Sequence, residues 1–276
     1  KLPIVQSGIN ITRIEVWVTN KSGVTENVRD IVACMDLGEG VPYQSSLKIP
    51  LAGDSLPRNG INRLYGKLKN NPLCRNTNTV VSAVTSSGFF DASEKKELVY
   101  MKTYAKKLST TEYTLYPQLG FISLQTTLNP SDILAVSYEY TYNGKTYKVG
   151  EFSQDMPTVN TNGDSTAITS ISQNVLFLKL LKGQAQNTST PMWDLMMKNI
   201  YSLGAYQISP TDFKLDVTYI IAGSGEKRFL NQGSVQGIPL LRLLNLDRLN
   251  NNNDPVPDGI FDFVQNVTII PQTGRL

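Results

Sequence analysis

Residues 133–149 read ILAVSYEYTYNGKTYKV, and this stretch decides the fold class of the chain. Apolar and aromatic residues recur at every second position before Asn143-Gly144, as in a strand with one buried face. Asn-Gly is the strongest short signal for a two-residue hairpin turn, because both residues readily adopt positive φ. The turn places Tyr140 opposite Tyr147, which makes a stabilising cross-strand aromatic pair. The sequence therefore predicts an antiparallel hairpin in a mainly β chain.

The composition indicates a folded, β-rich protein. The 276 residues are 40% apolar and 18% charged, which provides enough apolar material for a sizeable core. Tyr, Thr and Asn are frequent, and turn dipeptides recur along the chain. A polar, turn-rich segment at residues 153–173 marks a module boundary. We predict a mainly β (α+β) fold, with antiparallel sheets in two β-sandwich-like modules, residues 1–155 and 156–276, and a few short helices.

Hydrophobic spacing predicts further elements. Ile14, Val16 and Val18 alternate with other residues, which indicates a strand that has Trp17 on its polar face. Two more strands are expected, from about Leu98 and over Val175–Leu181, and helices are expected over Asn62–Lys69 and Pro191–Ile200. The residues of the last helix that should face the core are Trp193, Met196, Met197 and Ile200.

Residues 267–276 echo residues 113–122, with Thr, Pro, Gln and Gly at the same offsets. A Pro-Gln-x-Gly centre favours a tight turn, because Pro presets φ and Gly accepts positive φ. In the first copy a second strand follows, whereas the sequence stops two residues after Gly274. We therefore expect a hairpin whose partner strand belongs to a longer parent protein. A weaker echo at residues 201–219 predicts a short strand, a turn with Pro and Asp, and a long strand.

The chain contains no His and two Cys, Cys34 and Cys74. The lack of His excludes Ser-His-Asp and Cys-His catalysis, His-ligated zinc and His general bases. The two Cys lie outside any CxxC motif; they could be bridged in an oxidising compartment, or be free thiols with Cys34 in the core. The net charge of +3, without a basic cluster, gives no sign of a nucleic-acid partner.

A polar loop at residues 245–264 concentrates oxygen ligands of the kind that Ca²⁺ prefers. The candidate ligands are Asn250, Asn252, Asp254, Asp258 and Asp262. The loop departs from an EF-hand, because Pro255 stands where that motif needs Gly and no Glu closes it. Calcium is thus one interpretation, and a solvated turn rich in Asn and Asp is the other.

Four blocks of the sequence resemble one family. They are ITRIEVWVTN (11–20), YPQLGFISL (116–124), PMWDLMMKNIYSLGAYQ (191–207) and IPLLRLLNLDRLNNNNDPVPDGIFDFV (238–264). In this order, and over nearly the whole chain, they are similar to the SprA/Sov family, very large outer-membrane proteins of gliding and secreting Bacteroidetes. The resemblance implies a role in the type IX secretion translocon, a giant outer-membrane barrel that passes folded cargo to the cell surface and is needed for gliding in some species.

The resembling region is a soluble part of such proteins and not the barrel. The resemblance therefore implies a non-catalytic structural domain attached to the outer membrane, with the extracellular face favoured over the periplasm. The implied partners are the rest of the same long chain, other secretion-system proteins and secreted cargo. No catalytic residue and no cofactor are implied.

An alternative interpretation is a glycan-binding β-sandwich module or a glycosidase fragment of a surface protein. Trp17, on the polar face of its strand, could stack on a sugar ring. Asp258 and Asp262 could act as the acid and base of a glycosidase, which needs two carboxyl groups at the scissile bond. This alternative requires an exposed Trp17 and a carboxylate pair in a cleft.

Overall fold

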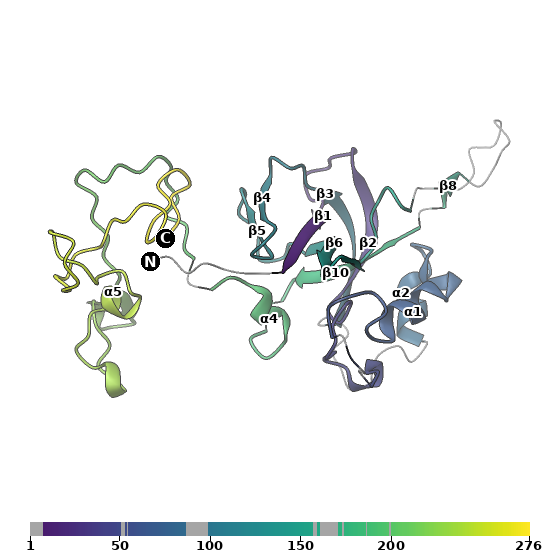
Figure 1. Cartoon of the computed structure of the whole chain (residues 1–276), viewed down its shortest axis with the longest axis horizontal. Coiled ribbons are helices and arrows are strands. Elements are labelled where there is room, and N and C mark those ends of the chain that lie inside the picture. The colour runs from purple at the N-terminus through teal and green to yellow at the C-terminus, as the bar shows by residue number, and fades with distance from the viewer. Residues whose placement is uncertain are drawn as a thin grey trace. The chain divides into compact units, whose positions relative to one another are not determined.

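Figure 1 shows the computed structural model of the chain. It describes residues 8–50, 53, 55–86, 99–156, 159–160, 171–172, 174–185, 187–198 and 200–276. The chain divides into two compact units, residues 1–196 (unit 1) and 197–276 (unit 2). The division falls later than the boundary expected after residue 155, because strand β10 (Leu176–Lys182) belongs to the sheet of unit 1.

Five strands of unit 1 close into a small barrel. They are β1 (Ile9–Thr19), β2 (Val28–Cys34), β3 (Tyr100–Lys107), β6 (Leu134–Tyr142) and β10. Their order is β1-β3-β2-β10-β6, and β6 pairs with β1 to close the ring. All neighbouring strands are antiparallel except β2 and β10, which run parallel. β3 and β10 confirm the strands predicted from about Leu98 and over Val175–Leu181.

A mainly β fold is confirmed, at 30% strand and 13% helix, but the prediction of two β-sandwich-like modules is wrong. The reason lies in β1, which has a partner strand on each edge. It pairs with β6 from Ile9 to Val18, and its last residues, Trp17–Thr19, also pair with β3. A strand shared in this way joins the two ends of one sheet, whereas a sandwich keeps two separate sheets.

The hairpin predicted at residues 133–149 is confirmed as β6 and β7 (Lys145–Val149). Tyr140 lies opposite Tyr147, and their ring centroids are 5.2 Å apart. Asn143 and Gly144 have φ of 48° and 72°, as a two-residue turn with positive φ at both positions requires. The local turn signal therefore fixed the register correctly.

The barrel interior is apolar. Side chains from all five strands meet there in one buried cluster: Trp17, Ile31, Ala33, Met35, Met101, Ala105, Ile133, Ala135, Leu176, Leu178, Leu180 and Met192. Trp17 is only 2% exposed. The expectation that Trp17 lies on a polar face is wrong, because β1 has its other face covered as well and is buried on both sides.

Two further apolar layers cover the outside of the barrel on different sides (Figure 1). Helices α1 (Leu64–Lys69) and α2 (Val80–Ser86) pack over β2 and β10. The hairpin of β4 (Tyr113–Tyr116) and β5 (Phe121–Leu124) packs over β1 and β6. α1 confirms the helix predicted over residues 62–69, and its Leu64 and Leu68 are buried as their spacing of four predicts.

The helix predicted over Pro191–Ile200 is much shorter than expected. α4 spans Met192–Leu195, and at Met196 the backbone is extended, with ψ of 129°. Residues beyond this point leave the helical face, so Met196, Met197 and Ile200 are exposed, and Met192 packs in the core instead. The other short elements described in unit 1 are η1 (Ser45–Leu47), η2 (Pro72–Cys74), β8 (Val159–Asn160) and β9 (Ile171–Ser172).

Unit 2 has little regular structure. Its elements are β11 (Tyr219–Ile221), β12 (Gly225–Lys227), η3 (Gly233–Val235) and α5 (Leu240–Leu243). Leu241, Phe261 and Ile269 form its small buried core, with partly buried neighbours around them. Only the end of the strand predicted up to Tyr219 pairs in a ladder, as β11.

The Pro-Gln-x-Gly turn is formed in both copies, with φ of 72° at Gly120 and 60° at Gly274. The first copy joins β4 to β5. In the last copy Arg275 bridges Ile270 on one side and Ser202 on the other. The residues that follow the second turn therefore find backbone partners within unit 2.

Candidate functional site

Residues 148–155, here called the clamp, join β7 to other parts of unit 1. The Asn59 side chain exchanges two hydrogen bonds with the backbone of Gly150: Nδ2 donates to the carbonyl at 3.1 Å, and Oδ1 accepts from N–H at 2.8 Å. The N–H of Glu151 donates to the Phe177 carbonyl of β10 at 3.0 Å. The clamp thus ties the segment before α1 to the barrel.

Glycine is required at position 150. Its φ is +79°, and a Cβ there would lie 2.9 Å from the Cβ of Ser137 on β6. Real Cβ atoms do not approach one another so closely, and L side chains rarely adopt that φ. Gly150 therefore lets the chain turn tightly against β6.

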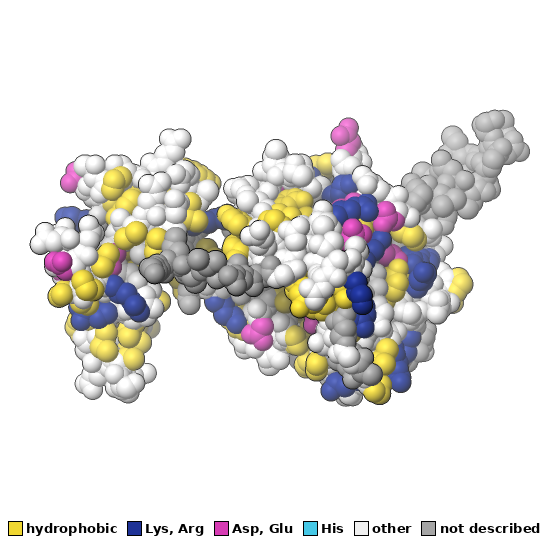
Figure 2. Space-filling view, in the orientation of Figure 1, with side chains coloured by type: hydrophobic (Ala, Val, Ile, Leu, Met, Phe, Trp, Pro, Cys, Tyr) yellow, Lys and Arg dark blue, Asp and Glu magenta, His cyan; other side chains and the backbone are white. Residues whose placement is uncertain are grey.

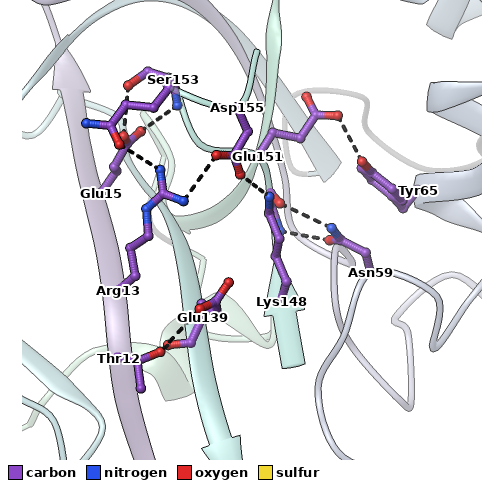
Figure 3. Close-up of polar contacts among 12 residues, drawn as sticks. Thr12, Arg13, Glu15, Asn59, Tyr65, Glu139, Lys148, Glu151, Ser153 and Asp155 are labelled. Atoms are coloured by element: carbon purple, nitrogen blue, oxygen red, sulfur yellow. Dashed lines mark hydrogen bonds and ion pairs between the residues drawn. The ribbon is translucent and has the colours of Figure 1, made fainter. Parts of the chain in front are cut away.

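Polar side chains of β1 hold the far end of the clamp (Figure 3). The Glu15 carboxylate accepts hydrogen bonds from Ser153, from N–H at 2.9 Å and from Oγ at 2.8 Å. Arg13 donates to Asp155 at 3.1 Å, and Lys148 donates to the other oxygen of Asp155 at 2.5 Å. The hydrogen bond from Lys148 is the largest cause that lowers the pKa of Asp155; burial opposes this shift, and the hydrogen bond from Arg13 lowers the pKa further.

Phe152 is the apolar centre of the clamp and is 0% exposed. The Arg13 guanidinium carbon lies 3.9 Å from the ring centroid, and Lys148 Nζ lies 4.9 Å from it. Two cations that share Asp155 therefore also contact one aromatic ring, and each contact is favourable through the ring quadrupole. The ring keeps both cations in place for the carboxylate.

Glu151 points inward and makes the most buried ion pair of the clamp. Its carboxylate accepts from Arg75 at 2.7 and 2.6 Å, from the Tyr65 hydroxyl at 3.0 Å and from the Phe177 N–H at 3.0 Å. The side chains of Arg75 and Glu151 are 15% and 3% exposed. Burial alone would lower the pKa of Arg75, but the hydrogen bonds and charge of Glu151 outweigh it and raise that pKa. This bidentate geometry is the strong form of the Arg–carboxylate pair.

Arg29 of β2 is a second buried cation near Glu151. Its Nε donates to the Asn174 carbonyl at 2.9 Å, and its Nη1 donates to the Met156 carbonyl. Burial lowers the pKa of Arg29, the charge of Glu151 opposes that shift, and the charge of Arg75 adds to it. Glu151 therefore balances two buried guanidinium groups.

These contacts define what the clamp can do chemically. Glu15, Glu151 and Asp155 each accept two or more hydrogen bonds from cations, hydroxyls or backbone N–H groups. Their lone pairs are thus engaged in holding chain segments together. The arrangement suits a rigid joint between the barrel, α1 and β7.

The first half of the predicted calcium loop forms a turn. Asn250 Oδ1 accepts from the N–H groups of Asn252 at 2.8 Å and Asp254 at 2.9 Å, and Asn250 Nδ2 donates to the Asp254 carboxylate at 3.1 Å. This is the local side-chain-to-backbone bonding by which Asn favours turns. Hydrogen bonds of the Asn250 side chain therefore hold these three candidate ligands together in one turn.

Asp258 and Asp262 hold other turns of the same loop. Asp258 Oδ1 accepts from the N–H of Ile260 at 2.9 Å. Asp262 Oδ2 accepts from the N–H groups of Arg248 at 2.6 Å and Leu249 at 3.0 Å. Each carboxylate thus organises a different backbone segment.

Sequence reasoning missed the central residue of this loop, Asp247, which is 0% exposed. Its Oδ1 accepts from the N–H groups of Asp258 at 3.0 Å and Gly259 at 3.1 Å, and Arg242 lies 3.4 Å from its Oδ2. The available signal was an acidic residue inside a leucine-rich stretch, Leu-Leu-Asn-Leu-Asp-Arg-Leu at residues 243–249. Such a carboxylate is expected to be buried only with hydrogen-bond partners.

The calcium site stays a prediction. Over the described ranges, no group of three or more Asp, Glu or Cys side chains lies close enough together to hold a metal ion. Calcium binding would therefore recruit the amide oxygens of Asn250 and Asn252 beside the carboxylates. A titration with millimolar Ca²⁺ and a chelator control tests it; an unchanged melting temperature would exclude a structural site.

Cys34 and Cys74 are free thiols, buried in the layer between α1, α2 and the barrel. Burial raises the pKa of the Cys34 thiol, and the nearby charge of Asp36 raises it further. Burial also raises the pKa of Cys74. Because the thiolate is the reactive form, both thiols are poor nucleophiles at neutral pH and act as core residues.

Unit 2 exposes many large apolar side chains, and hydrophobic side chains are visible over its surface in Figure 2. They are Met197, Ile200, Tyr201, Tyr206, Ile220, Ile221, Phe229, Leu244, Val256, Ile260, Val267 and Ile270. By contrast, six of its described residues are buried: Leu241, Asp247, Phe261, Ile269, Pro271 and Gly274. Apolar surface of this extent is typical of segments that pack against other polypeptide.

Known proteins were compared with the whole chain. No protein-family model and no curated protein matches it. Within the described ranges, none of the helices has the length and hydropathy of a membrane span. The function proposed for the chain therefore rests on its sequence blocks and on the properties of its two units.

Proposed function

We propose that the chain is a non-catalytic structural domain of a large outer-membrane protein that translocates folded proteins to the cell surface. The four sequence blocks that resemble the SprA/Sov family support this proposal. The protein would serve type IX secretion and gliding motility, attached to the outer membrane with its domain on the extracellular face. Its partners would be other parts of the same long chain, further secretion-system proteins and passing cargo.

The single observation that carries the proposal is the exposed apolar surface of unit 2. Ordering a residue costs roughly 1–2 kcal/mol of backbone entropy, and burial of apolar area must offset that cost. The buried core of unit 2 contains three large apolar residues, Leu241, Phe261 and Ile269. A unit with so small a core is best explained as part of a larger assembly, in which neighbouring segments cover its surface.

Unit 1 supports the same proposal in a different way. Its barrel is filled with side chains and covered by two outer layers, and the clamp joins these parts through buried ion pairs. Such a unit is suited to keep a fixed structure within a large protein assembly. Rigidity of this kind is useful where large cargo passes close by.

The glycan-binding alternative loses the residue on which it depended. Trp17 lies inside the barrel at 2% exposure, so no sugar ring can stack on it. Asp258 and Asp262, its candidate acid and base, each accept hydrogen bonds from backbone N–H groups. We therefore do not carry this alternative further.

The test is made in cells that produce the protein. Replacing the exposed Ile220 and Ile221 by Ser should reduce delivery of secreted cargo to the cell surface, while cargo is still synthesised. The matched control changes two exposed residues of β7 in unit 1, Lys145 and Thr146, to Ser. Undiminished cargo delivery after removal of the whole region 8–276 would refute the proposal.

A further inference from the structure

Residues 213–218, here called the open strand, have the side-chain pattern of a β-strand. Partly buried and exposed residues alternate along it: Phe213, Leu215 and Val217 are partly buried, and Lys214, Asp216 and Thr218 are exposed. The three partly buried side chains pack on the core of unit 2. A period of two with one face on a core is the signature of a half-buried strand.

The backbone of the open strand lacks a ladder. Among the residues that the structure describes, no backbone hydrogen bond involves residues 214–218. The chain continues directly into β11, where Tyr219 pairs with Lys227 of β12. The open strand therefore extends one strand of the β11–β12 hairpin, but the residues after Lys227 do not continue beside it as the second strand.

The cause is the path of the chain after β12. The carbonyl of Arg228 accepts a hydrogen bond from the N–H of Leu240 at 2.8 Å, and Phe229 bridges Pro239. These residues thus pair with the segment before α5 and leave the open strand. An unpaired row of N–H and C=O groups along a strand is a template for another strand.

The exposed charges of the open strand select a partner. Arg228 donates to Asp216 at 2.8 Å, so that the charge of Asp216 is balanced within unit 2. Lys214 is exposed and makes no ion pair with any described residue. Opposite charges directly across two strands are stabilising, and like charges are destabilising.

We propose that the open strand binds an extended strand of another polypeptide, which places an acidic residue opposite Lys214. Backbone hydrogen bonds provide the affinity of such strand addition, and the alternating side chains provide its specificity. The partner strand would carry apolar residues on the face that continues the core of unit 2. This inference does not depend on the proposed secretion role, because it follows from the backbone and charges of unit 2 alone.

The test uses the full chain and two capped nine-residue peptides, Thr-Val-Thr-Val-Glu-Val-Thr-Val-Thr and its matched control with Lys in place of Glu. The sequence is symmetric about its centre, so in the register that centres the peptide on Lys214 parallel and antiparallel binding present the charged residue in the same way. At millimolar concentration the Glu peptide should slow amide hydrogen exchange at residues 214–218. It should bind about fivefold more tightly than the Lys peptide, as expected for a favourable against an unfavourable cross-strand pair.

A charge-reversed variant completes the experiment. In Lys214→Glu the preference should reverse, so that the Lys peptide binds more tightly. Lys214 is exposed, and unchanged exchange in residues 270–276 will show that unit 2 remains folded. Three results would overturn the inference: no protection by either peptide, equal binding of the two, or protection that rises with protein concentration without peptide, which would assign the strand to a second copy of the chain.

Discussion

Replacing Glu151 by Gln tests the clamp at its most buried point. The side chain keeps its size, but its negative charge is removed, and an amide N–H₂ group now faces Arg75. The guanidinium of Arg75 then loses two charge-assisted hydrogen bonds, of 2.7 and 2.6 Å. Arg29 loses the charge that opposes the lowering of its pKa. Two buried cations remain with reduced compensation.

The size of the effect follows from burial. Arg75 and Glu151 have side chains that are 15% and 3% exposed, so solvent screens this pair only weakly. Removing one partner of a buried ion pair costs about 3–5 kcal/mol, because an uncompensated charge stays in the protein. The single oxygen of the Gln amide can still accept the hydrogen bond from the Phe177 N–H, and the Tyr65 hydroxyl can turn to accept one from the amide N–H₂ group. We therefore expect the lower end of this range, about 3 kcal/mol.

Urea unfolding followed by tryptophan fluorescence measures this loss. The chain has two Trp, and both Trp17 and Trp193 lie in unit 1, so the signal reports on the unit that contains the clamp. The urea concentration at the midpoint of unfolding should fall, while the slope of the unfolding free energy against urea concentration should stay constant. This combination indicates lower stability without a change in the surface area exposed on unfolding.

The matched control is Arg13→Met at the exposed end of the clamp. Its ion pair with Asp155 has side chains that are 33% and 39% exposed, and such pairs contribute about 0–1 kcal/mol. Loss of its contact with Phe152 adds to this, and the total should remain well below that for Glu151→Gln. A loss under about 1 kcal/mol for Glu151→Gln would refute the reasoning that the buried pair holds the joint.

Three further predictions concern other parts of the chain. A hydrogen bond from Lys21 lowers the pKa of Asp132 in the folded state. The ionised carboxylate therefore stabilises the fold above the ordinary carboxyl pKa, and this contribution is lost as the pH falls through the lower folded-state pKa. In unfolding curves measured at several pH values, Asp132→Asn should make the loss of stability below about pH 4 less steep. Gly274→Ala would place a Cβ 1.7 Å from the Ala205 carbonyl oxygen and should speed amide hydrogen exchange of residues 270–276. Gly120→Ala is the control: Gly120 has a similar φ but open space around it, so the variant should lose only about 1 kcal/mol of unfolding free energy. Equal effects of the two substitutions would contradict the close approach at Gly274. Tyr140→Ala should reduce the unfolding free energy by about 2–4 kcal/mol, because the ring is 2% exposed, and an unchanged melting temperature would argue against the hairpin register.

The sequence predicts those parts of the fold that depend on local chemistry. Asn143-Gly144 needs positive φ at both positions, which fixes the turn and with it the pairing of Tyr140 and Tyr147. The Pro-Gln-x-Gly turns follow from the same logic, since Gly120 and Gly274 both adopt positive φ. In these cases neighbours in the chain determine the structure.

Barrel closure could not be predicted in this way. It needs the parallel pairing of β2 with β10, in which Ile31 lies opposite Leu176. The apolar run from Ile31 to Met35 predicts a strand buried on both faces, but it does not tell which strand will be its neighbour. The burial of Trp17 was predicted wrongly for the same reason. An alternating pattern distinguishes the two faces of a strand, but it does not show that other elements pack against both of them.

The candidate site shows a similar limit. Asn250 and Asp262 stand out because oxygen-rich residues cluster in sequence, yet each holds a turn by hydrogen bonds to the backbone. Glu151 went unnoticed because its partner is remote in sequence: it binds Arg75, which is 76 positions away. Buried carboxylates of this kind are found only when the fold has brought their donors together.

The parallel pair of β2 and β10 also sets the order in which the domain can be made. The ring cannot be completed until Leu176 has been synthesised and can pair with Ile31. Until then one edge of β2 is unpaired in a partly formed sheet, and strands of other nascent chains can pair with it incorrectly. Contacts between such distant residues slow folding. A holding chaperone that shields this edge would raise the yield of folded unit 1 more than one acting on the β6–β7 hairpin, which closes as soon as Val149 has emerged.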